Sequence, residues 1–110
     1  MAYDEDLAER VRAALATHRG LSERKMFGGL AFMLQGNMCC GVVGSDLMVR
    51  VGPDGYDDAL RRAHTREMDF TGRPMRGMVY VAADGVRPTR DLRVWVERGA
   101  AFVESLPPKR

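Results

Sequence analysis

Apolar and polar side chains alternate along residues 25–51, which is the pattern of β-strands. Three segments alternate in this way: residues 30–34, 38–42 and 47–51. The links between them, Gly36-Asn37 and Gly44-Ser45, are two residues long, and each begins with a glycine that can adopt the positive φ of a tight turn. Parallel neighbours would need a crossover of a dozen or more residues. The pattern therefore predicts an antiparallel meander.

Apolar residues spaced three or four apart predict three helices, over residues 4–18, 56–64 and 89–106. Acidic residues at the start of the first helix and Gly20 after its end agree with capping and with the helix dipole. Thr89 is expected to cap the last helix. Gly99 lies inside that helix at a cost of about 1 kcal/mol, which predicts a close approach to the sheet.

The other segments carry weaker patterns. Residues 21–23 are interpreted as a short connection, residues 24–27 as a short strand, and residues 67–77 as an ordered loop. Residues 78–82 alternate again and predict one more strand, after which Asp84-Gly85 turns the chain.

Together these elements predict an α+β fold, a two-layer sandwich in a single domain over residues 1–110. Its antiparallel sheet is a meander of three to four strands plus one or two further strands, with helices on one face. The expected order is α-β-β-β(β)-α-β(β)-α. The uncovered face is expected to carry Met33, Met48 and one of the two cysteines, and to offer a surface for a partner or for a homodimer.

Composition changes this picture little. The chain is 45% hydrophobic and 29% charged, with a net charge of +2, which is typical of an ordinary globular protein. No apolar run is long enough to span a bilayer, and the acidic start MAYDEDLAERV is unlike a signal peptide. We therefore expect a cytoplasmic protein without a membrane partner. The weak net charge permits nucleic acid as a partner but does not indicate it.

The residues most often used for catalysis have structural interpretations in this chain. Cys39 and Cys40 are adjacent in a strand, so we expect their side chains on opposite faces as buried, reduced thiols. His18 and His64 are expected to complete the ends of helices. No set of His, Cys, Asp or Glu has metal-ligand spacing. We therefore expect no catalytic residue, no cofactor and no metal site.

The strongest polar candidates are five cations that flank the glycine-rich segments: Arg24, Lys25, Arg50, Arg73 and Arg76. If residues 71–77 fold over the meander, these cations and the backbone of Gly28 and Gly29 could contact an anion or a partner. The alternative is that the cations are solvated residues at the rim of the fold. Both interpretations stay open at this point.

Three segments follow one another in this order: KMFGGLAFMLQGNMCCGVV, LMVRVGPDGYDDAL and MDFTGRPMRGMVYV. On these segments, the chain resembles the TfoX N-terminal domain family, also called TfoX/Sxy-like. The resemblance covers almost the whole chain and implies a single sandwich of an antiparallel sheet with helices. Members named for competence regulation carry a second, C-terminal domain and act in the transcriptional programme for DNA uptake. Because this chain ends at Arg110, the resemblance implies a stand-alone domain without that second domain. It implies no catalytic or ligand residues.

These observations predict a non-enzymatic regulatory or protein-interaction domain, similar to the N-terminal domain of TfoX-type competence and transcription regulators, with another protein as partner. One alternative is a nucleic-acid-binding accessory protein that uses an arginine-rich surface. A second alternative is a small anionic-ligand binder or cryptic enzyme at the region of Gly28, Gly29 and Arg73.

Overall fold

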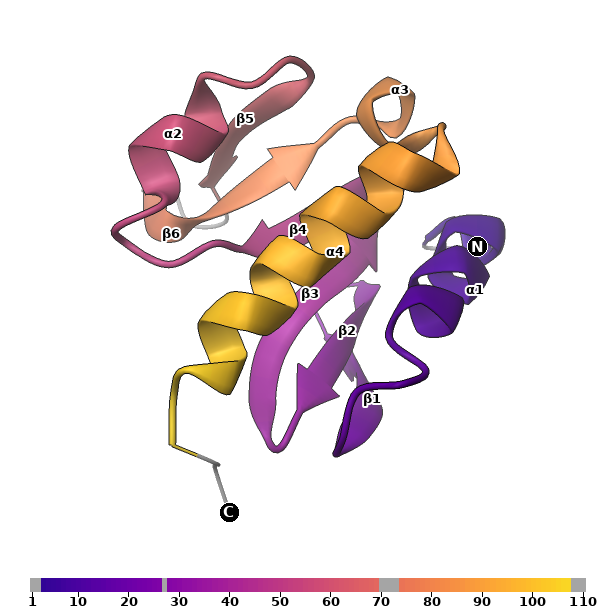
Figure 1. Ribbon diagram of the computed structural model, residues 1–110. Coiled ribbons are helices and arrows are strands. Elements are labelled where there is room, and N and C mark those ends of the chain that lie inside the picture. The colour runs from indigo at the N-terminus through magenta and orange to yellow at the C-terminus, as the bar shows by residue number, and fades with distance from the viewer. Residues whose placement is uncertain (1–2, 27, 70–73, 108–110) are drawn as a thin grey trace.

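A computed structural model describes residues 3–26, 28–69 and 74–107 of the chain, and these form one antiparallel sheet with helices packed on one face (Figure 1). The elements, in chain order, are α1 (Glu5–Ala14), β1 (Leu21–Met26), β2 (Gly29–Leu34), β3 (Asn37–Val43), β4 (Asp46–Arg50), α2 (Tyr56–Leu60), β5 (Thr65–Asp69), β6 (Pro74–Val81), α3 (Ala83–Val86) and α4 (Thr89–Glu104). The strands lie in the order β1-β2-β3-β4-β6-β5. The predicted α+β class and its antiparallel sheet are confirmed.

The meander of β2, β3 and β4 is present as predicted, with one shift at its first turn. Leu34 pairs with Asn37, so the two loop residues are Gln35 and Gly36 and not Gly36 and Asn37. Both loop residues have positive φ, 52° and 84°, as a tight primed hairpin turn requires. Gly44 has a φ of 59° in the second turn, where the prediction was correct.

The two edge strands of the sheet were not predicted over their full length. Residues 21–23 begin β1 and are not a connection, and the predicted loop over residues 67–77 contains the end of β5 and the start of β6. Residues 70–73 of that loop lie outside the described part of the chain. Residues 22–25 of β1 are all exposed, so this edge strand lacks the buried apolar residues that identify the inner strands.

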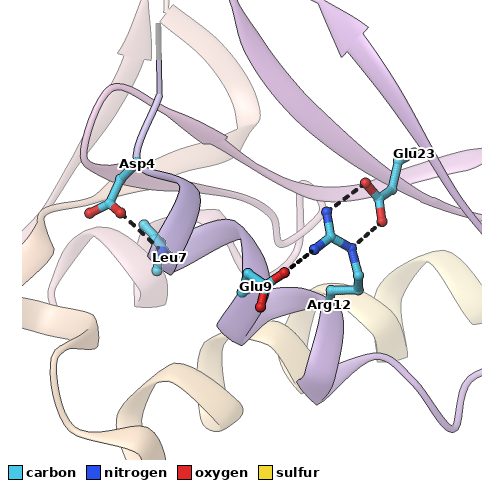
Figure 2. Close-up of polar contacts among 5 residues, drawn as sticks. All are labelled: Asp4, Leu7, Glu9, Arg12 and Glu23. Carbon is cyan, nitrogen blue, oxygen red and sulfur yellow. Dashed lines mark hydrogen bonds and ion pairs between the residues drawn. The ribbon is translucent and has the colours of Figure 1, made fainter. Parts of the chain in front are cut away.

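The first helix is shorter than predicted and is tied to β1. It ends at Ala14, four residues before His18. Its N-cap is Asp4, whose Oδ1 accepts a hydrogen bond from the Leu7 backbone N–H at 3.1 Å, as Figure 2 shows. Arg12 bridges Glu9 of the same helix and Glu23 of β1, donating from Nη2 to Glu23 Oε1 at 2.8 Å (Figure 2). The contact between Arg12 and Glu23 joins α1 to the edge strand β1.

The last helix crosses the face of β3 and β4 (Figure 1). Its buried residues are Leu92, Trp95, Val96, Gly99, Ala100 and Val103. A Cβ on Gly99 would lie 2.8 Å from the Cys39 carbonyl oxygen, which confirms the predicted close approach. The N-cap is Pro88, without a side-chain hydrogen bond, so the prediction that Thr89 caps this helix was wrong and Thr89 is its first residue.

The two shorter helices also differ from the prediction. Helix α2 ends at Leu60, so His64 lies beyond it, with a φ of 68°. Asp84 and Gly85 belong to the one-turn helix α3 instead of a simple turn. Every described helix contributes its buried residues to the same core cluster, on one face of the sheet. Among the described helices, none is long and apolar enough to cross a membrane.

A β-bulge places both cysteines on the helix-covered face. Phe32 pairs with Cys40 and Met33 with Met38, which leaves Cys39 as the extra residue of β3. The extra residue breaks the period of two, and both cysteines join the core under α4. The prediction that their side chains point to opposite faces was therefore wrong.

The second face of the sheet carries a separate cluster of buried residues: Met48, Met68, Met78 and Tyr80. Met48 lies in this cluster, as the alternation predicted for the uncovered face, whereas Met33 is half-buried. Among the described residues, Val94 of α4 is the large hydrophobic side chain that stands exposed. The proposed homodimer through this face stays a prediction.

Candidate functional site

The cations singled out from the sequence lie in two separate places. Arg24 and Lys25 are on the edge strand β1, next to the hairpin that contains Gly28 and Gly29. Arg50 ends β4 and Arg76 lies in β6, its neighbour in the sheet. Three strand spacings, roughly 14 Å, separate β1 from β4. Arg73 lies outside the described residues.

The backbone of the β1–β2 hairpin explains why positions 28 and 29 are glycines. Gly28 has a φ of 73° in the turn. A Cβ on Gly29 would lie 2.3 Å from the Val42 carbonyl oxygen, so glycine is needed there for β2 to pair closely with β3. The close approach that Gly29 permits is to the protein's own backbone.

Arg50 and Arg76 line one surface pocket of about 280 Å³. The other lining residues are apolar side chains and glycines: Met38, Gly52, Pro53, Gly77, Met78 and Phe102. They come from β3, β6, the link after β4, and the second half of α4. Of the five candidate cations, the fold thus brings at least these two together. We call this hollow the Arg50–Arg76 pocket.

Arg50 is held at this pocket by an aromatic platform. Its guanidinium carbon lies 5.4 Å from the centroid of the Phe102 ring, within the range of a cation–π contact. The side chain is half-buried, and no carboxylate within the described part of the chain pairs with it. A guanidinium stacked on a ring keeps the N–H donors at its edges free for another group.

Arg76 is held in a similar way but is more open to solvent. Its guanidinium carbon lies 5.5 Å from the centroid of the Tyr56 ring, and its side chain is 66% exposed. Asp57 approaches it at 4.0 Å, the long limit for an ion pair. An exposed pair at that distance contributes little stability.

The ring of Tyr56 contacts the Arg76 guanidinium, and the Tyr56 hydroxyl is buried. The residue is 5% exposed, and its hydroxyl has no hydrogen-bond partner among the described residues. Burial raises the pKa of this phenol above its ordinary value. Tyr56 therefore acts here as a neutral platform for the guanidinium.

Two of the residues that line the pocket are glycines with positive φ. Gly52 and Gly77 have φ values of 83° and 96°. The Gly77 carbonyl accepts hydrogen bonds from the N–H groups of Val51 at 2.8 Å and Gly52 at 3.0 Å. A Cβ on Gly52 would lie 2.4 Å from two carbons of the Phe102 ring. Glycine at position 52 is thus needed for the Phe102 platform to occupy its place.

The chemistry of this pocket is that of binding. The described residues that line it offer guanidinium, thioether, phenyl and backbone groups. Arginine remains protonated across the physiological pH range, and none of the other groups is a strong nucleophile or a general base. The pocket suits an anionic group that has an apolar neighbour.

Sequence reasoning missed part of this site. Gly52 and Gly77 follow Arg50 and Arg76 closely in the sequence, and this proximity was the available signal. Phe102 is 52 positions from Arg50, and only the packing of α4 on the sheet brings its ring to the guanidinium.

A second pocket, of about 270 Å³, lies between the segment after α2 and helices α3 and α4, and includes His64 and Trp95. Its two arginines already have partners. Arg98 donates to Asp58 at 2.9 Å and to the Gly55 carbonyl at 2.9 Å, and Arg62 lies 3.6 Å from Asp58. This pocket is therefore the weaker candidate for an anionic ligand.

The cysteines are placed as core residues. Both are fully buried, and the Cys39 thiol lies 4.0 Å from the Val96 carbonyl of α4. The neighbouring Cys39 thiol, and secondly burial, raise the pKa of Cys40 well above its ordinary value. A thiol in this environment remains protonated and weakly nucleophilic at neutral pH.

His18 does not complete α1 as predicted, because the helix ends earlier. Instead, its ring lies between two carboxylates of α4, with Nε2 2.7 Å from Glu97 and Nδ1 2.9 Å from Glu104. Hydrogen bonds with Glu104 and then with Glu97 raise the pKa of His18 above its ordinary value. In the described residues, no three His, Cys, Asp or Glu side chains are arranged to hold a metal ion.

Comparison with known proteins identifies the family of this chain. The searches of curated proteins and of solved structures each found no match. The sequence pattern of the TfoX N-terminal domain matches residues 13–103, which include all six strands and most of α4. This chain therefore belongs to the TfoX N-terminal domain family.

Proposed function

We propose that this chain is a non-enzymatic regulatory domain that acts by binding another protein. Membership of the TfoX N-terminal domain family supports a role of the type found in competence and transcription regulators. The observation that carries the proposal is the Arg50–Arg76 pocket, because its lining residues can bind an anionic group but offer no proton-transfer or nucleophilic chemistry.

Charge pairing makes the nucleic-acid alternative weaker. Of the thirteen arginines in the described part of the chain, six have an acidic partner: Arg12, Arg62, Arg66, Arg76, Arg87 and Arg98. Of the five cations singled out from the sequence, Arg24 and Lys25 lie on β1, whereas Arg50 and Arg76 lie on the neighbouring strands β4 and β6. A phosphate backbone binds best to a continuous track of cations.

The proposal can be tested in the native host by transcript profiling. A strain that lacks the chain would be complemented with the wild type, with the double variant Arg50→Met Arg76→Met, or with the control Arg90→Met Arg93→Met. The control removes two exposed arginines of α4 that lie about 13 Å or more from Phe102 along the helix. We expect the wild type and the control to restore the transcript profile and the pocket variant to fail.

All variants must first show the wild-type circular dichroism spectrum, so that loss of folding is separated from loss of binding. Restoration of the profile by the pocket variant would show that the pocket has no part in the regulatory role. A turnover activity that persists through purification and disappears with one substitution in the protein would contradict the non-enzymatic role.

A further inference from the structure

We infer that the Arg50–Arg76 pocket binds a carboxylate side chain with a neighbouring apolar residue, from an acidic and apolar segment of the partner protein. This inference rests on the proposed function and names the chemistry that the partner must present.

The carboxylate is assigned from the state of Arg50. Its guanidinium is stacked on Phe102 and lacks an acidic partner within the described residues, so its planar fork of N–H donors is available at the pocket. The geometry of that fork matches the two oxygens of a carboxylate, which can accept two parallel hydrogen bonds. Arg76 adds a second positive charge, because the carboxylate that pairs with it among the described residues, Asp57, is 4.0 Å away and exposed.

The apolar neighbour is assigned from the size and lining of the pocket. A volume of about 280 Å³ is at the lower limit for a ligand pocket, and it suits one or two side chains better than a complete cofactor. Met38 and Met78 line this hollow beside Phe102. Methionine side chains are flexible and polarizable, so they can adapt to different apolar residues of a partner.

The surrounding charges favour a single carboxylate over a polyphosphate chain. Asp57 approaches Arg76, and Asp54 is exposed directly after Pro53, which lines the pocket. A nucleic-acid backbone laid across the pocket would meet both carboxylates. A single carboxylate brings one negative charge to the pocket, so Asp54 and Asp57 repel it less than they repel a chain of phosphates.

The test is selection of a phage-displayed library of random dodecapeptides on the immobilised 110-residue chain. We expect the enriched peptides to share an Asp or Glu next to Leu, Met or Phe. The Kd of an enriched peptide, measured by fluorescence polarisation, should rise roughly tenfold or more in Arg50→Met, because a charge-assisted hydrogen-bond pair is lost. Arg50→Lys should give a smaller rise, and Arg93→Met should bind like the wild type.

Three results would overturn the inference. The first is enrichment of peptides without an acidic residue, and the second is a Kd that Arg50→Met leaves unchanged. The third is binding of a labelled DNA or RNA duplex that falls steeply with salt and is lost in Arg50→Met, since this would assign the pocket to nucleic acid. If acidic peptides fail but the pocket variant still loses the transcript profile in the host, the proposed function survives and only the carboxylate chemistry is wrong.

Discussion

At the scale of single residues, the candidate site depends on a position that only glycine can occupy. Gly52 has positive φ, and a Cβ there would overlap the Phe102 ring that supports Arg50. Gly44 also has positive φ, but a Cβ there would meet nothing within 4 Å. These two glycines therefore separate backbone strain from steric overlap.

We expect Gly52→Ala to lower the free energy of unfolding by about 1–3 kcal/mol, through strain and displacement of Phe102. Gly44→Ala should cost only about 1 kcal/mol, the strain of a left-handed alanine. Urea denaturation of both variants measures the difference. An equal loss in the two variants would show that Phe102 moves away freely and is not a fixed platform.

The buried thiols provide a second prediction at this scale. Both are fully buried and the pKa of Cys40 is raised, so neither thiol should react rapidly with a disulfide reagent at neutral pH. Reaction with DTNB should be slow in the native protein and complete, at two thiols per chain, after unfolding. Rapid reaction of the native protein would contradict the core placement of the cysteines.

At the scale of elements, the inner strands and the long helix could be predicted because they bury regularly spaced apolar residues in the core. The alternation around Val49 and the helical spacing around Trp95 both report burial directly. The edge strand β1 has exposed residues on both faces, so its sequence lacks that signal. The bulge at Cys39 could not be predicted, because a single extra residue depends on how β3 pairs with β2.

Helix α4 gives a prediction whose sign tests its packing on β3. In an isolated helix, Gly99→Ala would stabilise by about 1 kcal/mol through helix propensity. In this fold the new Cβ would lie 2.8 Å from the Cys39 carbonyl oxygen, so we expect a net loss of about 1–3 kcal/mol in the free energy of unfolding.

The control for this prediction is Ala101→Gly, at an exposed position of the same helix. It should cost about 1 kcal/mol from propensity alone. Thermal unfolding followed by circular dichroism compares the two variants. A rise in the Tm of Gly99→Ala would show that α4 does not approach the sheet this closely.

At the scale of the whole molecule, contacts between distant segments join the layers. Arg10 of α1 donates to the Val86 carbonyl at 2.6 Å, and Arg98 of α4 joins α2. His18, after α1, lies between Glu97 and Glu104 of α4. None of these pairs could be predicted from the sequence, because each joins residues 40 or more positions apart. The same long-range packing brings Phe102 to Arg50.

The His18 contact makes the stability of the whole fold depend on pH. Both ring nitrogens face a carboxylate, and only the protonated imidazolium can donate to both. The two hydrogen bonds raise the pKa of His18 in the folded state above its ordinary value near 6.5. The contribution to stability is therefore fully present below the unfolded-state pKa, and it is lost as the pH rises through the raised, folded-state value.

We expect the difference in free energy of unfolding between the wild type and His18→Gln to be about 1 kcal/mol at acidic pH and to shrink above neutrality. Urea denaturation between about pH 5 and pH 9 covers this window. The control His64→Asn removes the other histidine and keeps a residue that tolerates its positive φ of 68°, so it measures the effect of losing a histidine outside this contact. A difference that grows with pH would have the wrong sign for a raised pKa. It would place the imidazole outside the two carboxylates of α4 and leave this end of α1 without its link to the C-terminal helix.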